Sequence, residues 1–228
     1  MTAPPETVFD RVARIGLVPV IIIDRVEHAL PLADALLAGG LPVAEITFRT
    51  AAAEEVIRIL SRERPQLLVG AGTVLTGANL EAAKASGAAF GVAPGLNPQI
   101  VNQARELGLP FVPGVVTPSE IEIGMSLGCK VLKFFPAEAL GGTAMIDALA
   151  APFKHTGVRF VPSGGVTPGN LESYLKLGCV AAAGGTWIAK PEDLKEGNWE
   201  QISARCRAVV ESVKRAREAG AQKSKASQ

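Results

Sequence analysis

The chain has 228 residues, of which 48% are hydrophobic, so it can bury one sizeable core but is too short for two comfortable domains. Its 23 Lys and Arg residues nearly balance its 22 Asp and Glu residues, which argues against binding nucleic acid or an anionic membrane through an overall field. A charged fraction of 20% excludes a mainly disordered chain, and the longest apolar run, 17–23, is far shorter than the ~20 residues that a membrane-spanning helix needs.

Short apolar runs alternate along the chain with segments of helical pattern, after an extra helix expected at 5–15. The predicted strands are 17–23, 42–47, 67–72, 89–93, 110–114, 130–135, 158–163 and 180–184, and the predicted helices are 25–38, 51–63, 77–86, 98–107, 118–127, 142–150, 168–177 and 199–217. This alternation indicates parallel βαβ units. Eight short units predict an α/β fold, a single-domain (β/α)8 TIM barrel; an open doubly wound sheet has the same alternation and is the alternative.

Four of the strand-to-helix segments share one pattern. After a Gly turn each offers a helix N-cap, and eleven residues later each has a Gly suited to a left-handed C-terminal cap. The cap candidates are Thr76, Asn97, Thr117 and Thr167, and the closing glycines are Gly87, Gly108, Gly128 and Gly178. The spacing predicts helices of about three turns.

The segment KVLKFFPAE at 130–138 places a lysine inside an apolar strand. Because side chains alternate along a strand, Val131, Lys133 and Phe135 should share one face. Lysine is rarely buried without a reason, although a snorkelling or salt-bridged side chain is the alternative. Burial disfavours the ammonium, and the neutral amine is the form that attacks a ketone to give a Schiff base. We therefore predict that Lys133 is a nucleophile.

The segment VAEITFRT at 43–50 places Glu45, Thr47 and Arg49 on one strand face. The Glu could move protons and the Arg could hold a carboxylate through two hydrogen bonds, with a structural Glu–Arg pair as the alternative. Thr73 ends the next strand with the parity of Ala71; alone this is a weak signal, since Gly-Thr after a strand is usually turn chemistry.

Two glycine turns, PSGG at 162–165 and AGGTW at 183–187, follow the last two predicted strands. Barrels often bind phosphate there through backbone N–H groups and a short extra helix, for which 187–197 has room. Ser163 and Thr186 could add hydroxyl donors. Ordinary strand-to-helix turns are the alternative.

No metal or dinucleotide site is expected. His28 and His155 lie far apart with no carboxylate cluster, and the GxGxxG pattern is absent. Cys129, Cys179 and Cys206 are scattered and odd in number, which favours a reducing cytoplasm. The N-terminus shows no signal peptide. We therefore expect a cytoplasmic protein with no cofactor, nucleic acid or membrane partner.

The strings KFFPAE around Lys133, EITFRT, GAGTV, APGL, PSGGV and GGTW resemble those of 2-keto-3-deoxy-6-phosphogluconate (KDPG) aldolases, often bifunctional with 4-hydroxy-2-oxoglutarate (KHG) aldolase. The resemblance runs from about Val8 to Glu218. It implies a metal-free class I aldolase on a (β/α)8 barrel, usually a homotrimer, whose partner is a small 2-keto acid phosphate. We expect residues 1–218 to form the aldolase domain and 219–228 a disordered tail.

The resemblance also implies roles for individual residues. Lys133 matches the Schiff-base lysine, and Glu45 matches the general acid/base acting through a bound water. Residues that contact the pyruvate part are matched by Arg49, Thr73, Pro94 and Phe135, and the phosphate-binding turns contain Ser163, Gly164, Gly165, Gly185 and Thr186. Ser163 stands where relatives often carry Thr, and keeps the hydroxyl.

Three alternatives remain open from the sequence. A 2-keto-3-deoxy-6-phosphogalactonate aldolase would differ in the C4 epimer that it cleaves. A sugar-phosphate isomerase, epimerase or decarboxylase would share the phosphate turns without needing an imine at Lys133. A non-catalytic sugar-phosphate binding barrel would keep only the fold.

Overall fold

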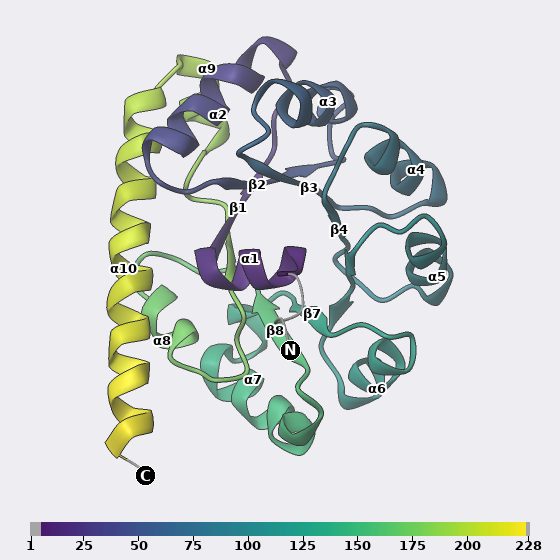
Figure 1. The fold of residues 1–228 in the computed structure, drawn as a ribbon, viewed down its shortest axis with the longest axis vertical. Coiled ribbons are helices and arrows are strands. Elements are labelled where there is room, and N and C mark those ends of the chain that lie inside the picture. The colour runs from purple at the N-terminus through teal and green to yellow at the C-terminus, as the bar shows by residue number, and fades with distance from the viewer. Residues whose placement is uncertain (1–5, 227–228) are drawn as a thin grey trace.

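The structure is a computed structural model that describes the backbone of residues 6–226 and the side chains of residues 6–219. Parallel strands curl around a central axis, and helices surround them on the outside (Figure 1). The strands are β1 (Leu17–Ile21), β2 (Val43–Thr47), β3 (Leu68–Gly72), β4 (Phe90–Val92), β5 (Phe111–Val112), β6 (Gly114–Val115), β7 (Val131–Phe134), β8 (Arg159–Pro162) and β9 (Ala183–Gly185). The predicted strand at 110–114 is split in two at Pro113, which has no N–H to donate to a ladder.

The described strands form two parallel sheets. One has six strands in the order β5-β4-β3-β2-β1-β9, and the other has three in the order β6-β7-β8. The first strand therefore pairs with the last, Leu17 opposite Ala183, and β1 to β5 lie side by side in chain order. An open doubly wound sheet carries helices on both faces, whereas the helices that follow these strands surround the curled sheets on the outside (Figure 1), which argues against that alternative. The fold is an α/β fold with curled parallel sheets.

The helices largely occupy the predicted positions. They are α1 (Val8–Ile15), α2 (Ala29–Ala38), α3 (Ala53–Glu63), α4 (Gly77–Ala85), α5 (Pro98–Glu106), α6 (Pro118–Ser126), α7 (Gly142–Ala150), α8 (Leu171–Leu175), α9 (Pro191–Glu196) and α10 (Trp199–Ala226), with 3-10 turns η1 (Val26–His28), η2 (Glu138–Leu140) and η3 (Ala151–Thr156). Helix α10 continues past its predicted end at 217 and includes residues 219–226, for which we expect a disordered tail from the sequence. Ala, Gln and Lys in this stretch are good helix formers; residues 227–228 lie outside the described part.

Three of the four predicted N-caps are confirmed. The side chains of Thr76, Asn97 and Thr117 accept hydrogen bonds from the backbone N–H groups of the first turn. The closing glycines of these three segments all have positive φ. The fourth segment differs, because Thr167 donates its N–H to the Asn170 side chain at 2.7 Å and α8 begins only at Leu171. The predicted cap at Thr167 and left-handed cap at Gly178 are therefore wrong.

Helix α1 lies across the opening of the curled sheets (Figure 1). Its N-terminus is fixed by a capping box in which Thr7 and Asp10 exchange hydrogen bonds. Phe9 and Val12, on one face of the helix, line the same interior cavity as residues of the strands. The helix therefore forms one wall of that interior.

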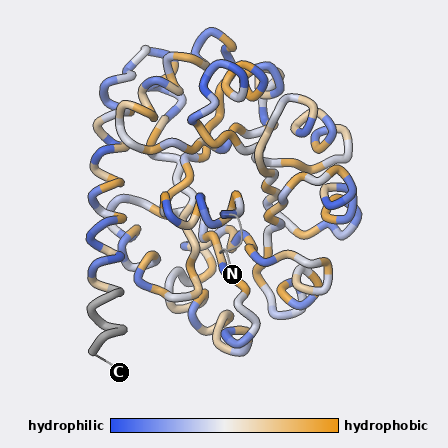
Figure 2. The backbone as a smooth tube through the Cα atoms, viewed as in Figure 1, coloured by the Kyte–Doolittle hydropathy of each residue, from blue (hydrophilic) through white to orange (hydrophobic). Residues whose placement is uncertain are grey.

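Alternation along the strands separates the interior from the helix-covered side. In β7, Val131 and Lys133 face the interior cavity, whereas Leu132 and Phe134 are fully buried on the other side. Leu132 packs against Gly124 of α6, where an added Cβ would lie 2.9 Å from Leu132 Cδ2. Figure 2 shows hydrophobic residues along the strands and hydrophilic residues on the surrounding helices. The predicted shared face of Val131 and Lys133 is confirmed, whereas Phe135 lies beyond the end of β7 and does not line the cavity.

Candidate active site

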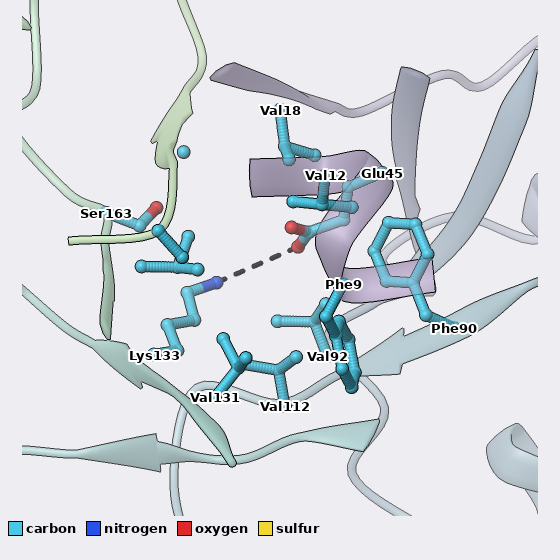
Figure 3. A pocket seen from close by; sticks show the side chains of 13 residues that line it. Phe9, Val12, Val18, Glu45, Phe90, Val92, Val112, Val131, Lys133 and Ser163 are labelled. Carbon is cyan, nitrogen blue, oxygen red and sulfur yellow. Dashed lines mark ion pairs between the residues drawn. The ribbon is translucent and has the colours of Figure 1, made fainter. Parts of the chain in front are cut away.

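The interior cavity combines an apolar lining with three polar side chains, Glu45, Lys133 and Ser163 (Figure 3). The apolar part comes from α1 and from strands around the ring: Phe9, Val12, Val18, Phe90, Val92, Val112, Val131, Val161 and Ala181. An acid, an amine and a hydroxyl in such surroundings interact with one another more strongly than in water. This is the setting expected for covalent chemistry at an amine.

Lys133 and Glu45 point toward each other across the cavity (Figure 3). The Lys133 Nζ lies 3.7 Å from Glu45 Oε1, and the two side chains are 9% and 5% exposed. The Nζ also lies 5.3 Å from the centroid of the Phe135 ring. Two opposite charges offset part of the cost of burying each. Lysine snorkelling to the solvent is thus excluded as the explanation of Lys133.

The Glu45 carboxylate keeps an unused acceptor. Its Oε1 is buried and accepts no hydrogen bond from the part of the chain that the structure describes, because 3.7 Å from Lys133 Nζ is beyond hydrogen-bond range. A buried acceptor without a donor is costly in a purely structural residue. The same oxygen is well placed to take a proton from a molecule bound beside Lys133.

The structural pair between Glu45 and Arg49, which was the alternative interpretation, is not formed. Within residues 6–219, Glu45 pairs with Lys133 and Arg49 has an exposed side chain with no ion pair. The strand that carries Glu45 is instead fixed through Thr47, whose buried Oγ1 donates to the carbonyl of Ile21 in β1 at 3.0 Å. Arg49 lies two residues after the end of β2 and is available to an anionic ligand.

Glycine in β3 makes room for the Glu45 side chain. A Cβ at Gly72 would overlap Glu45 Oε1 and lie 2.7 Å from its Cγ, and a Cβ at Gly70 would overlap the ring of Phe90. The interior positions of β3 are therefore Gly70 and Gly72. Thr73 was expected to continue the face of Ala71, but that face is the outer one, and Thr73 leaves the strand with φ +55°.

We expect Gly72→Ala to displace the Glu45 carboxylate and lower kcat. The added methyl has no space beside Oε1, and even a small displacement of a catalytic group can cost on the order of 100-fold in rate. Steady-state kinetics of this variant, with Gly95→Ala as control because nothing lies within 4 Å of a Cβ there, measures the effect. Unchanged kcat in Gly72→Ala would show that the position of Glu45 is unimportant.

The glycine turns after β8 and β9 lie next to this cavity. Ser163 is 5% exposed and lines the cavity, and its Oγ lies 2.8 Å from where a Cβ of Gly184 would be. Gly164 and Gly165 both have φ +87°, a conformation that side chains other than glycine rarely adopt. Ser163, predicted with the phosphate turns, thus shares the cavity with Lys133 and Glu45. The short helix expected within 187–197 is confirmed as α9.

The other predicted site residues follow directly or closely after the carboxyl ends of strands. Arg49 follows β2, Thr73 follows β3 and Pro94 follows β4; Phe135 and Thr186 follow β7 and β9. Carboxyl ends of parallel strands lie on one side of a curled sheet, which is where enzymes with (β/α)8 barrels bind their ligands. None of the five lines the cavity itself.

Sequence reasoning missed Phe9 and Val12, the two residues with which α1 lines the cavity. The signal was present, because apolar residues recur at helical spacing in VFDRVARI. Nothing in that spacing, however, says which surface the helix covers.

Residues 6–226 contain no helix long and apolar enough to cross a membrane. In the same part of the chain, no three His, Cys, Asp or Glu side chains gather as a metal ion would need.

The model of one enzyme family, KDPG and KHG aldolase, matches residues 8–205. The chain belongs to the KDPG and KHG aldolase family. It is 42% identical to 2-dehydro-3-deoxy-phosphogluconate aldolase of Haemophilus influenzae, over 94% of this chain and 100% of that one. It is 43% identical to the KHG/KDPG aldolase of Escherichia coli K12, over 87% and 92%. Family membership makes this protein an aldolase, hence a lyase, and not a binding barrel.

A solved structure extends the likeness to three dimensions. The KDPG aldolase of Legionella pneumophila, solved with pyruvate captured as a covalent carbinolamine intermediate, is 40% identical. It superimposes with a TM-score of 0.85 and covers 89% of this chain and 98% of its own. The aldolase fold is therefore shared as well as the sequence.

Proposed function

We propose that this protein is a class I aldolase that cleaves KDPG to pyruvate and glyceraldehyde 3-phosphate through a Schiff base on Lys133. The observation that carries the proposal is the buried Lys133–Glu45 pair, 3.7 Å apart, whose Glu45 Oε1 has no hydrogen-bond donor among the described residues. An amine nucleophile beside a carboxylate able to exchange protons is what imine chemistry requires. Membership of the KDPG and KHG aldolase family supports it.

The reaction then proceeds in four steps. Lys133 passes its ammonium proton to Glu45, the neutral amine adds to the C2 ketone, and Glu45 returns the proton as water leaves, which gives an iminium. This cation accepts electrons as the C3–C4 bond breaks, while Glu45, directly or through water, takes the proton of the C4 hydroxyl. Glyceraldehyde 3-phosphate leaves, and the remaining enamine is protonated at C3. Hydrolysis releases pyruvate and restores the Lys133 amine.

The residues around the pair orient the substrate. Arg49 and Thr73 hold the carboxylate end of the pyruvate part. Pro94 and Phe135 lie beside C3, the carbon that becomes the methyl group of pyruvate. The backbone N–H groups of the turns at 164–165 and 185–186 bind the phosphate, with Ser163 and Thr186 as hydroxyl donors. Fixing the carboxylate and the phosphate at opposite ends of the substrate aligns C2 with Nζ, and alignment of this kind accounts for a large part of a rate enhancement.

The experiment that tests the function is cleavage of KDPG measured by pyruvate release. We expect KDPG turnover that is unchanged by EDTA, since the lysine mechanism needs no metal. KHG should be cleaved to pyruvate and glyoxylate as a second activity. If the galactonate epimer were cleaved faster than KDPG, the phosphogalactonate assignment would replace this one. Absence of pyruvate from all three substrates would reject the function.

The phosphate turn can be tested at Thr186, which has an exposed side chain. We expect Thr186→Val to raise KM for KDPG by about tenfold to a hundredfold, the range of one lost hydrogen bond to a charged group. KM for KHG, which carries no phosphate, should stay unchanged. Initial-rate kinetics on both substrates measures the split, and equal losses on both would remove Thr186 from phosphate binding.

We further propose that the two curled sheets close into one (β/α)8 barrel within the domain expected at 1–218, of which residues 1–5 lie outside the described part. The parallel bridge between Phe160 of β8 and Val180 before β9 supports closure on one side. On the other side only Pro113 separates β5 from β6.

We also propose that the protein is a homotrimer. The exposed side chains of Leu75 and Ile123 offer apolar surface for contacts between subunits. Light scattering of the purified protein tests this proposal. The free cysteines support a cytoplasmic location.

A further inference from the structure

A buried tyrosine is hydrogen-bonded to a glutamate that has no role in the proposed reaction. Tyr174 of α8 is fully buried, and its hydroxyl donates a hydrogen bond to Glu138 Oε1. Glu138 begins η2, four residues after the β7 strand that carries Lys133 ends. The contact therefore joins the loop after the Lys133 strand to the helix that follows the Gly164–Gly165 turn.

The stem of Glu138 packs directly on that turn. A Cβ at Gly165 would lie 2.5 Å from Glu138 Cβ and 2.6 Å from its Cγ. The backbone is joined at the same place, because Glu138 N–H donates to the Gly164 carbonyl at 3.0 Å and Ala137 N–H to the Ser163 carbonyl at 2.8 Å. The side chain and the main chain of one residue thus both support the turn.

Two more contacts hold Glu138 and the turn. Gly142, with φ +62°, leaves space for the pair, since a Cβ there would lie 3.1 Å from Glu138 Oε1 and 3.4 Å from Tyr174 Oη. Within the turn segment, Asn170 donates from Nδ2 to the Gly165 carbonyl at 3.2 Å. Asn170 therefore supports the turn from the α8 side, and Glu138 supports it from the β7 side.

The protonation state of the tyrosine is fixed. Burial, and then the bond to Glu138 and its charge, raise the pKa of the Tyr174 hydroxyl. The hydroxyl consequently remains a donor across the pH range of an enzyme assay, and the tether does not weaken in mild alkali.

We infer that Glu138, tethered by Tyr174, is a positioning residue that fixes the Gly164–Gly165 turn for the phosphate of the substrate. The inference rests on the proposed phosphate role of that turn. The tether keeps the Glu138 stem packed against Gly165 and so keeps the turn in one conformation.

The test is Tyr174→Phe, which removes the tether and keeps the ring that fills the core. We expect KM for KDPG to rise about tenfold, because loss of geometry at a charged contact costs affinity, with kcat within about twofold. KM and kcat for KHG should stay unchanged, since KHG has no phosphate. A merely structural role would lower both activities together.

Three further variants complete the test. Glu138→Gln keeps an oxygen that accepts from Tyr174 and should keep the wild-type KM for KDPG, whereas Glu138→Ala should reproduce Tyr174→Phe. The Tyr174→Phe/Glu138→Ala double variant should be no worse than either single one, as for two partners in one contact. Ser173→Ala removes a neighbouring hydroxyl, bonded to the Asn170 carbonyl, and should leave both KM values unchanged.

Two results would overturn the inference: equal changes on KDPG and KHG in Tyr174→Phe, or no change on KDPG. Circular dichroism and thermal melts identify a variant that fails to fold, in which case the Glu138→Ala kinetics decide in the same way. Failure of the proposed function is distinguishable, since it is seen in the wild-type protein as absence of KDPG cleavage.

Discussion

The Lys133→Met variant should lose KDPG cleavage by on the order of 10⁴-fold or more, because removing the nucleophile of a covalent mechanism removes most of the rate enhancement. Methionine is unbranched and apolar, so it fills the space of the lysine stem without burying a new charge. The fold should survive, which circular dichroism checks. Pyruvate release from KDPG is the measurement.

The same lysine should be the site of a chemical trap. Borohydride with pyruvate reduces the imine to a secondary amine, and peptide mass spectrometry should find this adduct at Lys133 alone. Lys130→Met is the matched control, because Lys130 is exposed and directly precedes the same strand, so this variant should leave cleavage and trapping intact. Modification elsewhere with Lys133 unmodified would refute the Schiff-base mechanism.

The sequence was most informative where a local rule decides the outcome. Strand parity placed Lys133 and Val131 on one face and Glu45 on the interior of β2, and the cavity lining confirms both. These predictions succeed because alternation along a regular strand depends only on neighbouring residues. For the same reason the caps at Thr76 and Thr117 could be read from the order of residues.

The rule failed where the chain leaves regular structure. Thr73 was given the face of Ala71, but the interior of β3 is occupied by glycines, because the Glu45 side chain and the Phe90 ring fill that space. Thr167 looked like the other caps, but Asn170 takes its N–H. At Thr73 the competing side chains come from other strands, which the local pattern does not contain. At Thr167 the competitor, Asn170, lies within the segment itself, but the spacing between the cap and the closing glycine takes no account of it.

Contacts between segments that lie far apart in the chain could not be predicted from the sequence. The Tyr174–Glu138 bond joins residues 36 apart, and either one alone reads as an ordinary helix or loop residue. The placement of α1 across the opening is similar, because its apolar face predicts burial but not its partner. Such contacts depend on which loops the curled sheet brings together.

We expect Glu45→Gln to lower kcat for KDPG cleavage by about 10²- to 10⁴-fold, the range for loss of general acid–base catalysis. The amide has the shape of the carboxylate and can accept a hydrogen bond, but it cannot accept the C4 hydroxyl proton. KM should change little, because Arg49 and the phosphate turns are untouched. Steady-state kinetics on KDPG measures this, with Glu63→Gln at an exposed carboxylate as the matched control.

Trapping separates the two halves of the mechanism in this variant. Borohydride and pyruvate should still label Lys133 in Glu45→Gln, more slowly, because the amine remains in place and only proton transfer is impaired. Full cleavage activity would remove Glu45 from proton transfer. Loss of both cleavage and labelling would assign Glu45 a different role, in keeping Lys133 positioned or reactive. The unused acceptor at Glu45 Oε1 favours impaired cleavage with Lys133 still labelled. An oxygen needed only to hold Lys133 would be within hydrogen-bond distance of Nζ and not 3.7 Å away.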